Sequence, residues 1–385
     1  MAKIAPVSHF LDRCTADWRS LPDECLIERF AALKCSQHPS MVTKGLRYLS
    51  AYLFGRNLIS LSEYLGLFQS SVIKCLTLDQ DTNAFRELSS GNDETSLARR
   101  YSRAKHGCLS DIEYMAQLVT NYISDALDNK GSHWRKLFEY ASKYEEPVVL
   151  MTTGWRNVPS SSNVIFDIAF EAINLKLSMM GLTTVINVKL PRIAPPCENY
   201  AQLSQKEREK VSEQQDHVIP DKNFYQWRNV HVIFGDDSLV TGATADKVFY
   251  HSMQNGAASF QAIYPIAIDP LIALTTPSIE EKLNSVEVKS KLNPLEVEFL
   301  LNGDYSVLLR TLRLLLADSN TEVFRDLLPK FSKEAQIDIY THAVNNNFHL
   351  SSSSKKSVEE LTGYLNKVGV IDTNGLLIRS HPGCR

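Results

Sequence analysis

The sequence predicts an α/β protein: a parallel-sheet core flanked by an N-terminal and a C-terminal helical region. Three observations predict this fold. Apolar residues recur at helical spacing over residues 1–143 and again over 278–385. Between these regions lie four short apolar runs rich in β-branched residues. Amphipathic helices join them in strand–helix–strand order, which is typical of a parallel sheet. We therefore expect domains at 1–143, 144–277 and 278–385.

Composition and charge argue against a strongly basic nucleic-acid-binding protein and against a membrane protein. The chain has 385 residues, of which 44% are hydrophobic, and 41 Lys+Arg against 44 Asp+Glu give a net charge of −3. This balance is unlike that of a strongly basic nucleic-acid-binding protein, so the overall charge does not indicate nucleic acid as a partner. No apolar run reaches the roughly 18 residues of a membrane-spanning helix. Asp12 and Arg13 interrupt any signal-peptide core. We expect a cytoplasmic protein with no membrane partner.

The seven cysteines are widely spaced and form no CxxC pair. This pattern indicates ordinary free thiols and neither a zinc site nor a redox centre. We accordingly predict no protein metal ligands from this pattern.

The N-terminal region is expected to be helical. Apolar residues follow helical spacing from Leu46 to Leu53 and from Ile112 to Tyr122. The polar segment 81–94 is predicted to connect two helices. No motif in this region indicates chemistry.

The four expected strands of the core are 147–152, 183–188, 230–234 and 262–267. A helix is predicted from Asn163 to the glycine at 181, and another over 244–255, closed by Gly256. A long insertion separates the second strand from the third.

The C-terminal region contains a leucine stripe between Leu308 and Leu316, which indicates core packing or a subunit contact. The region is predicted to end in one helix and a small hairpin over 370–378, with Asn374-Gly375 at the turn. We interpret this helix and hairpin as a packing element.

Two adjacent acids, Asp236 and Asp237, follow the third strand directly. The carboxyl ends of parallel strands are where α/β proteins bind ligands, and paired carboxylates accept hydrogen bonds from vicinal hydroxyls such as those of ribose. The loop behind them leads to the amino end of a helix, where backbone N–H groups and the helix dipole favour a phosphate. Gly242 allows a close approach of the backbone. The alternative is that the acid pair only caps the next helix.

This segment resembles the phosphoribosyl-pyrophosphate motif of type I phosphoribosyltransferases, a hydrophobic strand followed by two acids and a loop ending in Thr-Gly-x-Thr/Ser. The resemblance covers roughly residues 145–275. Two positions depart from the family pattern: Val240 stands where another Thr is frequent, and Gly235 replaces a large apolar residue. The resemblance implies that the phosphate-binding loop consists of Ser238, Leu239, Val240, Thr241, Gly242, Ala243 and Thr244.

The resemblance also implies roles for two other segments. The loop after the first strand, with Thr153, Gly154 and Arg156, would bind pyrophosphate. The insertion is similar to that of phosphoribosyltransferase-like proteins of bacterial stress and conflict loci, and this singles out Arg192, Tyr200 and Arg208. A solvated surface position is the alternative for Arg156, and a solvated helix face is the alternative for Arg208.

The function implied is displacement at ribose C1 through an oxocarbenium-like state. Asp236 and Asp237 would hold the ribose hydroxyls, and Arg156 with Mg²⁺ would stabilise the departing pyrophosphate. The ligand would be phosphoribosyl pyrophosphate or a ribose-5-phosphate-containing nucleotide, and the acceptor a base, another small nucleophile or a nucleic-acid end. The helical flanks suggest an oligomer or a protein partner, as in an antiphage or retron-associated effector. The alternatives are a catalytically silent phosphoribosyl sensor and a scaffold.

Overall fold

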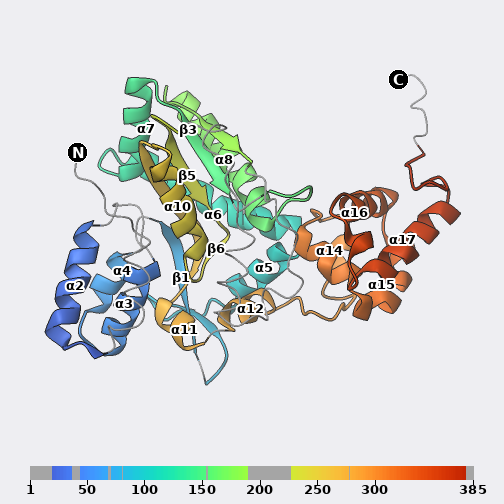
Figure 1. Cartoon of the computed structure of the whole chain (residues 1–385), viewed down its shortest axis with the longest axis horizontal. Coiled ribbons are helices and arrows are strands. Elements are labelled where there is room, and N and C mark those ends of the chain that lie inside the picture. The colour runs from blue at the N-terminus through green and yellow to red at the C-terminus, as the bar shows by residue number, and fades with distance from the viewer. Residues whose placement is uncertain are drawn as a thin grey trace.

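The computed structural model describes residues 20–36, 44–67, 71–79, 81–152, 155–189, 227–276 and 278–378. They form a mostly parallel mixed sheet with helices on both faces, beside a group of C-terminal helices (Figure 1). The α/β class is therefore confirmed. The strands are β1 (Val72–Leu78), β2 (Phe85–Glu87), β3 (Val148–Thr152), β4 (Val185–Val188), β5 (His231–Gly235), β6 (Ser238–Leu239) and β7 (Ser259–Ile268).

The strand order is β2-β1-β7-β5-β3-β4, and the short β6 pairs with β7. Every described pair is parallel except β1 with β2. The strands predicted at 147–152, 183–188, 230–234 and 262–267 correspond to β3, β4, β5 and β7, with ends that agree to within three residues. β3 and β5 are buried along their whole length, as expected for strands covered on both faces.

The N-terminal region differs from the helical prediction at β1 and β2. Val72 pairs with Tyr264 and Leu76 with Ile268, so β1 extends the sheet beyond β7. β2 lies inside the segment 81–94 that was predicted as a connection. The reason is tertiary: Leu76 and Leu78 of β1 are buried in the core, and the strand is held by β7 on one side and by β2 on the other, where Lys74 pairs with Glu87.

Two helical layers cover the sheet. Alternate strand residues point to each face, so Leu150 and Ile233 pack under one layer while Met151 and Phe234 pack under the other. One layer contains α5 (Thr95–Lys105), α6 (Leu109–Asp128), α7 (His133–Tyr144) and α8 (Ser161–Met179). The other contains α2 (Asp23–Ser36), α3 (Lys44–Gly55), α4 (Leu61–Gly66) and α10 (Ala243–Gln254).

After β7 the chain forms α11 (Pro270–Thr275) and α12 (Ile279–Asn284) and then enters the C-terminal helices. These pack around a separate apolar core, to which the predicted stripe contributes Leu312, Leu315 and Leu316. The predicted hairpin is reduced to one bridge between Ile371 and Leu377. The helices are α13 (Glu298–Leu301), α14 (Leu309–Leu316), α15 (Thr321–Leu327), α16 (Lys333–Asn345) and α17 (Lys355–Lys367).

Among the helices that the structure describes, none combines the length and the hydropathy needed to cross a membrane.

Candidate functional site

The strand order creates a point where connections diverge. β3 lies between β4 and β5, and the chain leaves β3 through α8 toward β4, then returns to add β5 on the other side. The connections that follow β3 and β5 therefore run to opposite sides, which leaves a crevice outside the carboxyl ends of these two neighbouring strands. Ser160 and Ser161 at the amino end of α8 and Asp236–Thr244 behind β5 line a cavity at this point.

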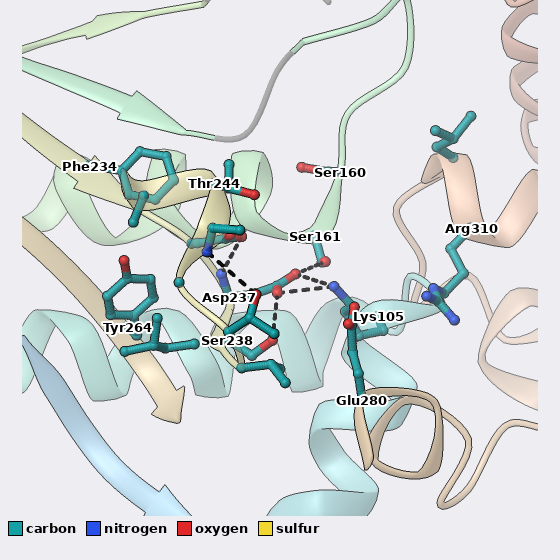
Figure 2. Close-up of a pocket in the computed structure, with 18 of the residues that line it drawn as sticks. Lys105, Ser160, Ser161, Phe234, Asp237, Ser238, Thr244, Tyr264, Glu280 and Arg310 are labelled. Carbon is teal, nitrogen blue, oxygen red and sulfur yellow. Dashed lines mark hydrogen bonds and ion pairs between the residues drawn. The ribbon is translucent and has the colours of Figure 1, made fainter. Parts of the chain in front are cut away.

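The cavity has a volume of about 300 Å³, which is within the size range of small-molecule sites. Figure 2 shows side chains entering it from the sheet, from α5, from α8 and from the C-terminal helices. Among the lining residues are three basic side chains, Lys105, Arg310 and Arg313, and three acidic ones, Asp236, Asp237 and Glu280. The site is therefore strongly polar and carries both charges.

Asp237 is the most heavily hydrogen-bonded of these groups. Its side chain is 4% exposed, and Lys105 Nζ lies 2.8 Å from Oδ2 and 3.0 Å from Oδ1. Ser161 Oγ donates to Oδ2, and Tyr101 OH donates to Oδ1 at 3.3 Å. Burial raises the pKa of this carboxyl, but the Lys105 charge and the hydrogen bonds outweigh it, so that the pKa lies below its ordinary value. Asp237 is thus an ionised carboxylate whose oxygens already have donors within the protein.

Asp236 lies next to it in a different state. One of its oxygens accepts a hydrogen bond from the backbone N–H of Asp237 at 2.9 Å. Burial and repulsion by the Asp237 charge raise the pKa of Asp236 well above its ordinary value, although Lys105 acts in the opposite direction. The two adjacent carboxyls therefore titrate as a coupled pair, in which Asp237 carries the charge first.

The segment from Ser238 to Thr244 forms one wall of the cavity. It ends at the amino end of α10, where Gly242 has a left-handed φ of 80° and no side chain to cap the helix, and where Thr241 Oγ1 accepts from the backbone N–H of Ala243 at 3.4 Å. The buried Arg47 supports the segment from below by donating to the carbonyl oxygen of Val240 at 2.9 Å. The backbone N–H groups of the first turn of α10 thus begin at the cavity wall, beside Thr241 and Thr244.

Both departures from the family pattern have a structural explanation. A Cβ at Gly235 would lie 2.5 Å from the ring of Phe166, so α8 supplies the bulk that a large residue would otherwise bring. Val240 packs its side chain against the apolar core and uses its backbone to accept from Arg47.

Several lining residues were not predicted from the sequence. Lys105 comes from α5, Ser161 from α8, and Arg310 and Arg313 from α14; Tyr101 of α5 lies behind the wall and donates to Asp237. Lys105 and Asp237 are 132 positions apart in the chain. No local motif marks these residues, because only the packing of α5 and α14 against the core brings them to the site.

Of the other predicted site residues, the structure describes only Arg156. Arg156 is half-buried in the connection between β3 and α8 but is not among the lining residues. Thr153, Gly154, Arg192, Tyr200 and Arg208 lie outside the described residues.

No protein-family model, no curated protein and no solved structure matches the chain. The functional interpretation therefore rests on the motif and on the geometry of the cavity.

Proposed function

We propose that the cavity binds the ribose 5-phosphate part of phosphoribosyl pyrophosphate or of a nucleotide. The observation that carries the proposal is the arrangement around β5: an acid pair at the carboxyl end of the strand and the amino end of α10 line the same cavity. A pentose with a phosphate on C5 carries hydroxyls for the carboxylates and an anion for the helix amino end.

The phosphate group would lie at the amino end of α10. The N–H groups of the first helical turn have no partners inside the helix, and the helix dipole favours an anion there. Thr241 and Thr244 add hydroxyl groups beside the same turn. Gly242 gives the loop its left-handed turn without strain.

The ribose hydroxyls would be bound by Asp236 rather than by both acids. The oxygens of Asp237 accept from Lys105, Ser161 and Tyr101, whereas Asp236 has one accepted bond from a backbone N–H. Asp237 then has a positioning role, since its charge holds Lys105 and Ser161 in the cavity wall.

Magnesium fits the site only together with the ligand. Within the described parts of the chain, no three acidic, histidine or cysteine side chains are arranged to hold a metal ion. Mg²⁺ commonly binds through one or two carboxylates and the phosphates of a substrate, and Asp236 is the carboxylate placed for this. When bound, the ion would neutralise phosphate charge.

The reaction that we propose is transfer of the phosphoribosyl group. The bond between C1 and the pyrophosphate oxygen breaks, with the electron pair leaving on pyrophosphate, and the acceptor forms the new bond to C1 and releases a proton. By resemblance to proteins of conflict loci, we extend the proposal to an antiphage or toxin-like effector.

One observation favours a second function, that of a catalytically silent sensor. α14 belongs to the C-terminal helices and yet lines the cavity. A ligand in the cavity would touch both regions at once and stabilise their contact without any reaction.

Pyrophosphate release separates these functions. The full chain is incubated with Mg²⁺, phosphoribosyl pyrophosphate and a panel of bases and nucleotides, and its melting temperature is measured in parallel. A transferase releases pyrophosphate with one acceptor, and Asp236→Ala abolishes the release. A sensor shows a higher melting temperature with no release. If the chain shows no pyrophosphate release and no shift in melting temperature, the proposal is overturned.

A further inference from the structure

The wall of the cavity formed by α14 carries two arginines. Arg310 and Arg313 are three positions apart in one helix, so their side chains project from neighbouring points of one face. Figure 2 shows Arg310 on the far side of Lys105 and Asp237 from Thr244. The proposed phosphate position at α10 and the guanidinium of Arg310 are thus at opposite ends of the cavity.

The charge of Arg310 is little used within the protein. Its Nη1 lies 3.9 Å from Glu281 Oε2, and its side chain is 34% exposed. An ion pair at this distance and exposure is weak. Lys105, in contrast, donates to both oxygens of Asp237 at 3.0 Å or less. Of these two cations, Arg310 is therefore the one that a ligand anion can engage.

The residues on both sides of Arg310 are held by the core. The backbone N–H of Leu309 donates to the carbonyl oxygen of Pro159 at 3.2 Å, next to the Ser160 wall. The hydroxyl of the buried Thr311 donates to the carbonyl oxygen of His106 at 2.7 Å, next to Lys105. Two anchors of this kind fix the position from which Arg310 projects, which is what a specific binding residue requires.

We propose that Arg310, assisted by Arg313, binds a second anionic group of the ligand, a phosphate or pyrophosphate at the end of the pentose opposite to the 5-phosphate. This rests on the proposed function. The ligand class that follows is a pentose phosphorylated at two separate positions, recognised at one end by α10 and at the other by α14. A planar guanidinium suits this group because it donates two parallel hydrogen bonds to phosphate oxygens.

The test compares two ligands that differ in the second anionic group. Affinities of the full chain for ribose 5-phosphate and for phosphoribosyl pyrophosphate are measured by calorimetry with Mg²⁺ present. The wild type is expected to bind phosphoribosyl pyrophosphate at least about tenfold more tightly. Arg310→Ala should remove that advantage and leave the affinity for ribose 5-phosphate within about twofold. Arg325→Ala is the matched control, because Arg325 belongs to the same group of helices but pairs with Glu360 outside the cavity.

Each outcome decides the proposal. Equal wild-type affinity for the two ligands, or equal weakening of both by Arg310→Ala, overturns the role of Arg310 while the proposed binding of ribose 5-phosphate stands. Failure of the wild type to bind ribose 5-phosphate and phosphoribosyl pyrophosphate overturns the proposed function and this inference with it. Arg310→Lys keeps the charge without the paired donors and should lose part of the advantage. If circular dichroism shows that Arg310→Ala does not fold, the Arg310→Lys variant tests the role of Arg310 in its place.

Discussion

Asp236 and Asp237 are neighbours in sequence, yet their environments differ. Asp237 is surrounded by donors, with Lys105 at 2.8 Å, whereas Asp236 is half-buried beside the charge of Asp237. The pKa of Asp236 is raised and that of Asp237 is lowered, so they contribute to stability with opposite dependence on pH.

The first prediction concerns this opposite dependence. A raised carboxyl pKa contributes stability that is fully present below the ordinary value of about 4 and is lost as the pH rises through the raised pKa. Asp236→Asn avoids that loss, so its melting temperature should exceed that of the wild type by a few degrees at pH 7.5, and the gain should shrink toward pH 4.

Asp237→Asn is the matched comparison. A lowered pKa contributes stability that is present above about 4 and lost as the pH falls through the folded value. This variant should therefore melt below the wild type at pH 7.5. Shifts of the same sign in the two variants would contradict the assignment of charge within the pair.

The second prediction concerns Lys105. Its side chain is 18% exposed and its partner carboxylate 4% exposed, so Lys105→Met leaves a buried charge without its counter-charge. We expect a loss of about 3–5 kcal/mol in the free energy of unfolding, measured by urea denaturation at pH 7. The double variant Lys105→Met/Asp237→Asn should recover most of it. A loss below about 1 kcal/mol would mean that the pair behaves as an exposed one.

At the scale of elements, α8 and β5 pack closely against each other where Gly235 of β5 faces the ring of Phe166 in α8. A Cβ on Gly235 would meet three ring atoms of Phe166 at 2.5–2.7 Å. β5 and the loop that carries the acid pair therefore approach α8 more closely than a larger residue permits.

The third prediction is that Gly235→Ala lowers the free energy of unfolding by about 1–3 kcal/mol, because the added methyl overpacks the core. Thermal denaturation measures this, and Phe166→Leu in the same chain should relieve part of the loss. Gly363→Ala is the control: its Cβ meets nothing within 4 Å inside α17, so it should stabilise by up to about 1 kcal/mol. A neutral Gly235→Ala would show that the contact with Phe166 does not shape the site.

An element can be predicted from the sequence when the residues that determine it are close together in the chain. β3, β5 and β7 are buried on both faces and read as continuous apolar runs, and the acid pair with its loop is contiguous in the chain. β1 was missed because it is only partly buried and its partner β7 lies about 190 residues away in sequence. Lys105 and Arg310 were missed for the same reason, since tertiary packing alone brings them to the cavity.

At the scale of the whole molecule, the C-terminal helices are held to the core beside the cavity. The carboxylate of Asp304 accepts from the backbone N–H of Ser110 at 2.9 Å and from its hydroxyl at 2.7 Å. The backbone N–H of Ser306 donates to the carbonyl oxygen of Gly107 at 2.8 Å. Figure 1 shows α14 as the member of this group that lies toward the core.

The fourth prediction is that Asp304→Ala loosens this contact without touching the cavity wall. Loss of the two hydrogen bonds should cost about 1–2 kcal/mol, speed amide exchange in α14 and weaken binding of phosphoribosyl pyrophosphate severalfold. Hydrogen–deuterium exchange and calorimetry measure these effects. Glu360→Ala, which removes an exposed ion pair within the C-terminal helices, should leave both unchanged. If Asp304→Ala binds phosphoribosyl pyrophosphate with unaltered affinity, the contact between the C-terminal helices and the core does not contribute to the site.

The most direct measurement is a calorimetric titration of the full chain at pH 7 with ribose 5-phosphate, and with ribose as the comparison that lacks the phosphate. We expect saturable binding of one ribose 5-phosphate per chain, no detectable binding of ribose, and at least tenfold weaker binding of ribose 5-phosphate by Asp236→Ala. An absence of heat with ribose 5-phosphate, or full affinity in Asp236→Ala, would contradict the placement of a phosphorylated pentose between β5 and α10.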